Sequence, residues 1–423
     1  MLTKLEKFVK YKTKGDKMRL IREIYLKQIR PFYDVDLIKV IVGVRRAGKS
    51  ILLETIIDEI IKSGISGDHI IYINFENLDY YHIKDFLDLN KEIKSRIVDD
   101  KKYYIFLDEI QHVKEFEKAL SSFRSSLNVS IFVTGSNSTL LSGELATLLT
   151  GRTVEFEILP FSFLEMKQYF ELNNRNYNDE LIYDYLKWGG FPIRFEFNRE
   201  EDISRYLNDL YDNIINRDIK NGSSRFDIKL FKDISLYILA NAGKEFSVDN
   251  IINYYNTNNK REISRQTVYN YLEKMKKAFL IHSVRKYNIV GKSALIGKDK
   301  FYAVDVGFRI INTNTINYDI SFFLENIVYN ELLSNGFDVY VGKTYKGEVD
   351  FIAIKNGKKC FIQVSYLLAN DETINREFNA FKPISDFAPK YVLSLDKVDF
   401  SRDGISHINI VDFLLHKKEL FLM

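Results

Sequence analysis

The chain is poor in cysteine and proline, with one cysteine, five prolines and 20 glycines among 423 residues. A single cysteine excludes an internal disulfide framework, and Cys360 lies in the apolar run 359–363, where we expect a core position. Long hydrophobic runs are also absent, since no stretch approaches the roughly eighteen uninterrupted apolar residues that span a membrane. The charged N-terminus lacks the apolar segment of a signal peptide. We therefore expect a cytoplasmic protein that is neither secreted nor embedded in a membrane.

The six histidines are scattered along the chain without the spacing of metal ligands, so a zinc site is not indicated. Apolar residues, in contrast, are abundant: 46% of the chain is hydrophobic and 14% is aromatic. That share can build several cores, and the length predicts about two to four domains.

The run 43–50 matches the phosphate-loop pattern G-x-x-x-x-G-K-[ST] at every fixed position, and it follows a strand-like segment at 37–42. In such a loop, successive backbone N–H groups face the phosphates, a lysine adds positive charge and a serine ligates Mg2+. The amphipathic segment that follows predicts a helix whose N-terminus completes the anion site. We therefore predict a site for a nucleotide and Mg2+, with the nucleotide bound by Gly43, Arg46, Ala47, Gly48, Lys49, Ser50 and Ile51.

A second segment, 103–109, is an unbroken apolar strand that ends in two carboxylates. Strands of this kind are buried on both faces of a parallel sheet, and ligands bind at the carboxyl edge of such sheets. Asp108 is placed to hold Mg2+ through water with Ser50, and Glu109 to polarise the attacking water in phosphoryl transfer. Together with the phosphate loop, this strand predicts nucleotide hydrolysis in an α/β domain.

Two further strands, 70–75 and 129–137, end in polar residues at the same edge of the expected sheet. Asn137, or alternatively Ser136, could sense the γ-phosphate through a hydrogen bond, and Asn74 could orient Glu109. All three residue types are also common in turns after a strand, so an ordinary turn stays open as the alternative for each.

Short motifs are spread over nearly the whole chain, at residues 43–50, 106–111, 134–138, 149–152, 159–163, 188–192, 217–219 and 347–351. In these motifs the chain resembles a family of bacterial and archaeal AAA-type ATPases whose C-terminal half is a domain of unknown function resembling PD-(D/E)xK nucleases. The resemblance implies that the nucleotide is ATP. It also implies that Arg152 is a finger for the γ-phosphate of a neighbouring subunit, which requires a homo-oligomer. A structural ion pair is the alternative for Arg152. Gly190 and Pro192 resemble the lid element that lies near the nucleotide in this family, and an ordinary turn is the alternative for them.

Positive charge concentrates between residues 260 and 300, where eleven Lys or Arg stand against three Asp or Glu. This excess indicates a surface that binds a polyanion. The same region predicts two helices, with Ser247 and Ser264 at their starts, followed by a strand at 281–287, which is the pattern of a winged helix. The second helix carries side chains of the types that reach bases and phosphates, so the candidate DNA contacts are Arg265, Gln266, Tyr269 and Lys276. Packing or docking of a partner protein is an equal alternative for this element.

The C-terminal part has the acidic positions of a PD-(D/E)xK nuclease. Such a core holds Mg2+ between an acid on a helix, an acid at a strand end and a ligand on the next strand. Glu325, Asp350 and Gln363 fill these three positions and form a candidate second metal site, with Glu348 beside Asp350.

The lysine of the nuclease pattern is missing, because Ser365 stands in its place. Either Lys343 or Lys346 supplies the charge, or the domain persists as a binding and scaffold module. We favour the second interpretation, in which this domain does not cleave nucleic acid.

The fold class expected overall is α/β, with a P-loop NTPase (AAA-type) core. The expected segments are a helical N-terminal extension at 1–19, the ATPase core at 20–165, a helical lid at 166–225, a winged-helix-like segment at 226–310 and a nuclease-like α/β domain at 311–423. We expect a Mg-dependent ATPase whose hydrolysis rearranges the DNA-binding and nuclease-like domains. The alternative is a nucleotide-gated switch that binds a protein partner and has a catalytically dead C-terminal domain.

Overall fold

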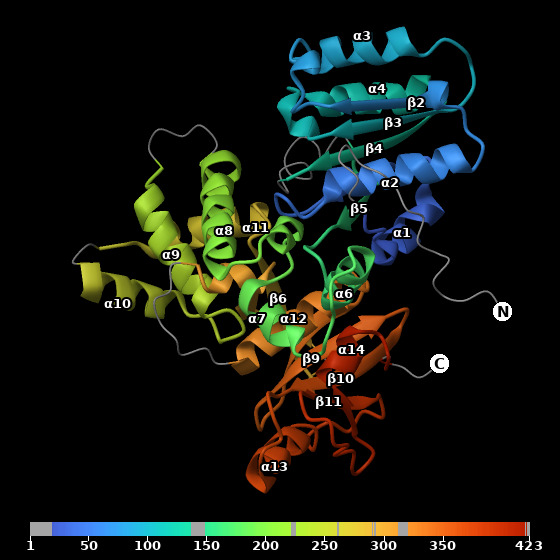
Figure 1. The fold of residues 1–423 in the computed structure, drawn as a ribbon. Coiled ribbons are helices and arrows are strands. Elements are labelled where there is room, and N and C mark those ends of the chain that lie inside the picture. Colours follow the sequence, from blue (N-terminus) through green and yellow to red (C-terminus); the bar gives the residue numbers. More distant parts are fainter. Residues whose placement is uncertain are drawn as a thin grey trace, which may run out of the picture. The chain divides into compact units, whose positions relative to one another are not determined.

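The computed structural model describes residues 19–136, 149–220, 226–259, 262–289, 291, 293–311, 320–418 and 420. The chain divides into two compact units, one ending at Ile158 and one beginning at Leu159, with Lys277–Phe279 grouped with the first unit (Figure 1). None of the described helices has the length and apolar character needed to cross a bilayer.

The first unit is built on a five-stranded parallel sheet with strand order β2-β3-β4-β1-β5. Its strands are β1 (Ile38–Val42), β2 (Ile70–Asn74), β3 (Tyr103–Asp108), β4 (Val129–Gly135) and β5 (Thr153–Glu157). Every residue of β1 and β3 is buried, and for β3 its unbroken apolar run predicted this burial. The expected α/β core with a parallel sheet is therefore confirmed.

Helices cover both faces of this sheet (Figure 1). They are α1 (Glu23–Ile29), α2 (Lys49–Lys62), α3 (Phe86–Arg96) and α4 (Phe116–Ser126). On one face, apolar residues of α1 and α2 form a continuous core with Phe106 and Phe132 of the sheet. This packing makes α1 part of the core, although it precedes β1 and the phosphate loop in the sequence.

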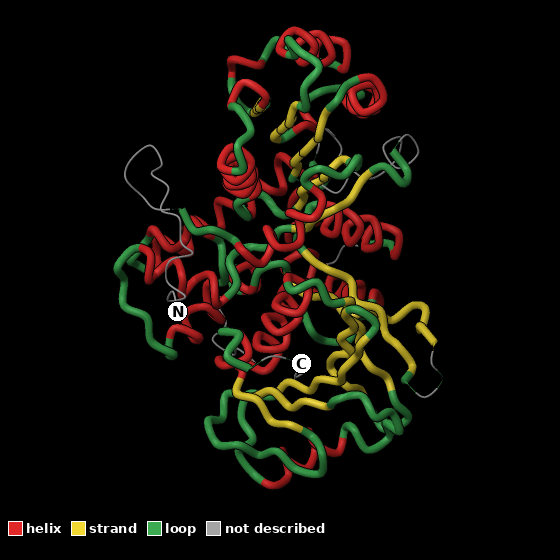
Figure 2. Tube along the Cα trace, turned by 90° about the vertical axis from the view of Figure 1, so that its right-hand side faces the viewer, coloured by secondary structure: helices red, strands yellow, loops and turns green. Residues whose placement is uncertain are grey.

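The second unit contains a seven-stranded mixed sheet with strand order β12-β11-β10-β9-β8-β6-β7, whose strands run side by side as yellow tubes in Figure 2. Its strands are β6 (Ile281–Asn288), β7 (Ser293–Ala303), β8 (Asp338–Lys343), β9 (Glu348–Lys355), β10 (Lys358–Val364), β11 (Lys390–Ser394) and β12 (Ser406–Asn409). Its helices are α6 (Phe163–Leu172), α7 (Leu181–Trp188), α8 (Glu200–Ile214), α9 (Ile228–Ala240), α10 (Val248–Asn259), α11 (Arg265–Lys277), α12 (Ile320–Ser334), α13 (Asp371–Asn379) and α14 (Ile410–Leu414). Cys360 on β10 is fully buried, as expected.

The strand expected as the wing of a winged helix belongs to the C-terminal sheet. β6 pairs with β7 as an antiparallel hairpin, and it also pairs in parallel with β8, where Lys286 lies opposite Val341. The boundary expected at residue 310 therefore divides a sheet that is continuous in the structure. The two helix starts are as predicted, because the hydroxyls of Ser247 and Ser264 accept hydrogen bonds from the first turns of α10 and α11.

Candidate nucleotide site and C-terminal carboxylate cluster

The phosphate loop joins β1 to α2 and is curled by residues with positive φ. Gly43 (φ 140°), Arg46 (φ 69°) and Gly48 (φ 100°) all adopt backbone conformations that most residues avoid. A side chain at Gly43 would also collide with the backbone carbonyl of Ile158, whose N–H donates to the Val42 carbonyl at 2.8 Å. Gly43 is thus required for both its conformation and the space it leaves.

Lys49 is the first residue of α2, so the helix begins directly at the loop. Gly48 precedes it as the N-cap residue, and the Gly48 carbonyl accepts a hydrogen bond from Leu52 N–H at 3.0 Å. Lys49 is buried, and its ammonium donates to the carbonyls of Gly43 at 2.9 Å and Val44 at 3.2 Å. This ammonium and the N–H groups of the first helical turn create the positive potential that binds a phosphate.

Asp108 lies at the carboxyl end of β3, within hydrogen-bonding reach of Ser50 on α2. Its buried carboxylate accepts hydrogen bonds from the side chains of Ser50, Thr134 and Asn74, the last at 3.1 Å. Burial raises the pKa of Asp108, and the hydrogen bonds oppose that rise. A hydroxyl beside a carboxylate is a pair of oxygen ligands that suits Mg2+ together with water and phosphate. The residues present therefore fit the magnesium ion that a phosphate loop implies.

Glu109 follows Asp108 and has a left-handed backbone conformation, with φ 56° and ψ 49°. A residue with a side chain adopts this conformation rarely, and mostly where its surroundings impose it. The Thr134 hydroxyl accepts a hydrogen bond from Glu109 N–H at 2.9 Å. Gln111 Nε2 donates to Glu109 Oε2 at 2.5 Å. Two neighbours to which the sequence gave no role thus hold the backbone and the carboxylate of Glu109.

The structure places the polar residues at the other strand ends as follows. Asn74 lies opposite Asp108 in the β2–β3 register and donates to it, so the expectation that Asn74 orients Glu109 is wrong. Ser136 is buried directly after β4. Asn137 lies outside the described residues, so its role as a γ-phosphate sensor stays a prediction.

Arg152 lies at the amino end of β5, on the opposite edge of the sheet from the phosphate loop. Its carbonyl accepts a hydrogen bond from Ile38 N–H at 2.9 Å, at the start of β1, whereas the loop follows the end of β1. Five strand residues at about 3.3 Å each separate the two points by roughly 16 Å. The exposed guanidinium lies 3.4 Å from the Ser121 hydroxyl. The backbone of Arg152 is therefore too far from the phosphate loop of its own chain for the guanidinium to contact phosphates bound there.

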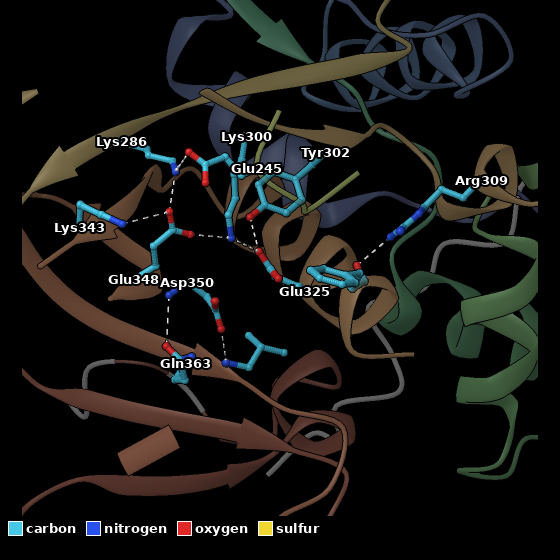
Figure 3. A network of polar contacts seen from close by, with 12 residues as sticks. Glu245, Lys286, Lys300, Tyr302, Arg309, Glu325, Lys343, Glu348, Asp350 and Gln363 are labelled. Carbon is cyan, nitrogen blue, oxygen red and sulfur yellow. Dashed lines mark hydrogen bonds and ion pairs between the residues drawn. The ribbon is translucent and has the colours of Figure 1, made fainter. Parts of the chain in front are cut away.

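The three residues of the candidate second metal site come together in the second unit (Figure 3). Glu325 extends from α12, Asp350 from β9 and Gln363 from β10. Gln363 Oε1 accepts a hydrogen bond from Asp350 N–H at 3.3 Å, and Asp350 Oδ2 accepts one from Val364 N–H at 2.8 Å. Glu325 is buried and accepts a hydrogen bond from the Tyr302 hydroxyl at 2.5 Å.

A lysine ammonium lies among these carboxylates (Figure 3). Lys300 Nζ is 3.2 Å from Glu325 Oε1 and 3.3 Å from Glu348 Oε2, and both Lys300 and Glu325 have only 7% of their side chains exposed. Burial alone would lower the pKa of Lys300, but the carboxylates around it raise the pKa above its usual value. Lys286 adds a second cation, 2.5 Å from Glu348 Oε1.

The expectation that Lys343 or Lys346 supplies the missing positive charge is wrong, because Lys300 and Lys286 supply it. Lys343 Nζ is 4.0 Å from Glu348 and its side chain is 45% exposed, whereas Lys300 and Lys286 are buried beside the carboxylates. The sequence pattern missed these two lysines because they lie on β6 and β7, which the strand order places in the C-terminal sheet.

The carboxylate cluster does not fit a divalent metal ion. Burial raises the pKa of Glu325, and burial together with Glu325 raises the pKa of Asp350 well above its usual value. The oxygens of Asp350 and Gln363 already accept backbone hydrogen bonds, and Lys300 already neutralises Glu325. Across the described part of the chain, no three His, Cys, Asp or Glu side chains are arranged to hold a metal. Glu325, Asp350 and Gln363 are thus neighbours, but they are not a set of metal ligands.

The candidate DNA contacts lie on α11 beside an acidic cleft of about 660 Å3. Four carboxylates, from Glu245, Asp249, Glu273 and Asp299, line this cleft together with Arg265, Tyr269 and Lys276. Arg265 pairs with Asp249 at 2.6 Å, and Lys276 pairs with Glu273 at 2.8 Å. Gln266 donates to Asn270 at 2.9 Å, and Tyr269 is half-exposed. Among the described residues that line this cleft, four carboxylates stand against two cations, which disfavours a polyanion in the cleft itself.

The glycines of the expected lid motif pack against Asp305 in the second unit. Asp305 Oδ2 accepts a hydrogen bond from Gly190 N–H at 2.6 Å, and Oδ1 accepts one from Gly307 N–H at 2.8 Å. A side chain at Gly189 would collide with this carboxylate. Burial raises the pKa of Asp305 to about 6, although the two hydrogen bonds oppose the rise. A side chain at Gly190 would collide with the Phe161 carbonyl, so close packing explains both glycines, and a role in the lid stays a prediction.

Comparison with known proteins agrees with this geometry. Residues 36–167 match a family model described as an AAA domain (AAA_14), and residues 179–315 match a domain of unknown function (DUF8612). The fold is similar to that of the Walker-type ATPase PABY2304 of Pyrococcus abyssi, with a TM-score of 0.50 and 16% identity over 69% of this chain and 95% of that one. The first unit is thus an AAA domain with the fold of P-loop ATPases.

Two relatives share almost the whole chain. An uncharacterized protein of Haemophilus influenzae is 36% identical over 406 residues, which cover 94% of this chain and 99% of the relative. The uncharacterized protein MJ1544 of Methanocaldococcus jannaschii is 32% identical over 89% of this chain and 85% of its own length. The chain belongs to the family of these bacterial and archaeal proteins. In this chain an AAA domain is followed by a long second unit.

Proposed function

We propose that this protein binds ATP with Mg2+ and hydrolyses it at the carboxyl edge of the first sheet. The observation that supports the proposal is the arrangement at the end of β3, where Asp108 lies beside Ser50 and Glu109 is held in a left-handed conformation. A left-handed conformation of a residue with a side chain costs about 1–3 kcal/mol, and such conformations cluster at functional sites.

Each residue of the site has a distinct role in this proposal. The loop N–H groups and Lys49 bind the β- and γ-phosphates, and Ser50 with Asp108 would hold Mg2+, which offsets the phosphate charge. Glu109 orients the attacking water and accepts its proton, with Gln111 fixing the direction of the carboxylate. Ser136 or Asn137 senses the γ-phosphate, and Arg152 reaches the nucleotide of a neighbouring copy, since its own phosphate loop is at the other edge of the sheet.

Steady-state release of phosphate from Mg-ATP tests this assignment. We expect Glu109→Gln to lower the turnover rate by at least about a hundredfold while ATP still binds. Lys49→Ala should abolish binding and turnover together. Lys39→Met is a control on the same sheet, because Lys39 is buried at the opposite edge, where it donates to Ser130 at 2.7 Å. Equal turnover by the wild type and Glu109→Gln would show that the phosphate is released elsewhere.

For the output of hydrolysis, we favour a switch that binds a protein partner and has a catalytically dead C-terminal domain. Two observations support it over a DNA motor: Arg265 and Lys276 are each paired with a carboxylate, and Lys300 is paired with Glu325 inside the nuclease-like cluster. Because these cations are already paired with carboxylates, we expect duplex DNA at low salt to leave the rate of phosphate release unchanged.

The DNA motor makes the opposite prediction. DNA should then stimulate phosphate release, the stimulation should decrease as salt rises, and it should be lost in the double variant Arg265→Ala with Lys276→Ala. This result would show that the α11 face contacts DNA.

A further inference from the structure

Arg22, at the start of α1, is a buried cation beside the phosphate loop. It lies before residues 36–167, which match the AAA family model. Only 3% of its surface is exposed, and its Nη1 donates to the carbonyl of Ala47 at 2.9 Å. The guanidinium also lies over the ring of Tyr25, 4.6 Å from the ring centre. Arg22 Nη1 also lies 3.8 Å from the position that a side chain at Gly48 would take.

The packing of α1 fixes Arg22 in place. Tyr25, Leu26 and Ile29 of α1 belong to the same buried core as Leu52 and Ile56 of α2. Arg22 is the N-cap residue of α1, and its carbonyl accepts hydrogen bonds from Tyr25 N–H at 3.1 Å and Leu26 N–H at 3.2 Å. The guanidinium therefore rests on a helix that cannot shift without disturbing the core beneath the phosphate loop.

The hydrogen bond from Arg22 controls the direction of one peptide group of the loop. In a trans peptide, the C=O and the following N–H point in opposite directions. Because Arg22 holds the Ala47 carbonyl on the protein side, the N–H of Gly48 in the same peptide points away from Arg22, toward the inside of the loop. Loop N–H groups of this kind bind the phosphates of a nucleotide.

We infer that Arg22 is a positioning residue of the nucleotide site, which aims the Gly48 N–H at the phosphates and adds a buried positive charge beside them. This inference rests on the proposed binding of ATP, and it assigns a part of that site to a segment of the chain outside the matched AAA domain. Since both effects act on phosphates that ATP and ADP share, Arg22 raises the affinity for both nucleotides and leaves the step at Glu109 unchanged.

Titration of the full-length protein with fluorescent ATP and ADP analogues tests the inference. In Arg22→Met, the Kd of both nucleotides should rise about tenfold, which is the size of one hydrogen bond to a charged group, while kcat at saturating ATP changes less than about twofold. Arg22→Lys keeps the charge without the planar guanidinium and should give an intermediate Kd.

Two control variants separate positioning from a general loss of stability or charge. Leu26→Ala should weaken the packing of α1 and lower the unfolding temperature, yet raise Kd less than Arg22→Met does, since it keeps the guanidinium that bonds to Ala47. Arg30→Gln removes a cation of the same segment that pairs with Glu23 and Glu59, and it should not change Kd. If Arg22→Met binds nucleotide as tightly as the wild type, or no more weakly than Leu26→Ala, the inference is wrong while the proposed function stands. Absence of binding by the wild type itself would overturn both.

Discussion

Replacing Lys300 with methionine should destabilise the second unit by about 3–5 kcal/mol near pH 8, because it leaves buried carboxylates without their cation. Lys300 Nζ lies 3.2 Å from Glu325 and 3.3 Å from Glu348, and the Lys300 and Glu325 side chains are each 7% exposed. Methionine has nearly the length of lysine, so the loss of charge outweighs any cavity.

The size of this loss should depend on pH. Burial raises the pKa of Glu325 even with Lys300 present, and removal of Lys300 should raise it further. A carboxyl group with a raised pKa in the folded state binds its proton more tightly there, so its contribution to stability decreases as pH rises through that pKa. The loss of stability caused by Lys300→Met should therefore be smaller at pH 5 than at pH 8.

Urea titration with tryptophan fluorescence as the readout measures this loss of stability in the second unit alone. The chain has one tryptophan, and Trp188 is buried at the end of α7 in that unit. Lys343→Met is the matched control, because Lys343 is 45% exposed and 4.0 Å from Glu348, and it should cost less than about 1 kcal/mol. The double variant Lys300→Met with Glu325→Gln should regain most of the loss. If Lys300→Met and Lys343→Met are equally stable at pH 8, the account of the cluster is refuted.

Three further predictions concern other parts of the chain. If Arg152 acts on the nucleotide of a neighbouring copy, Arg152→Ala and Glu109→Gln should each be inactive alone, but a mixture should regain part of the phosphate release; a mixture as inactive as its components would contradict this. Asp305→Asn should flatten the pH dependence of second-unit stability between about pH 4 and 7, since a pKa raised to about 6 makes the wild type lose about 3 kcal/mol as pH rises through it; parallel pH curves would contradict this. Cys360 is buried and its pKa is raised to about 12, so a thiol reagent should label it only in denaturant; rapid labelling of the folded protein would show that β10 is accessible.

The parts of the site that sequence predicted are those with a local pattern. The spacing from Gly43 to Lys49 identifies the phosphate loop, and the apolar run before Asp108 identifies the central strand, because both depend on neighbours along the chain. The helix starts at Ser247 and Ser264 were predictable for the same reason, since an N-cap acts on the residues that follow it.

The parts that sequence missed depend on contacts between distant segments. Thr134, Arg22 and Lys300 each act on residues between 25 and 48 positions away, and no spacing rule links them to the motifs. Lys300 was not predicted because the sequence pattern put β6 and β7 in a separate domain, whereas pairing of β6 with β8 brings them into the C-terminal sheet. Gln111 could have been found, since an amide two residues after Glu109 is close enough to bind its carboxylate.

Analysis of the nucleotide that stays bound after incubation with Mg-ATP tests the central claim most directly. The wild type should retain mostly ADP, and Glu109→Gln should retain mostly ATP, because it keeps the phosphate loop and Asp108 but lacks the base at the end of β3. ADP in both proteins would contradict the assignment of Glu109, and absence of nucleotide from both would contradict an ATP site at this loop.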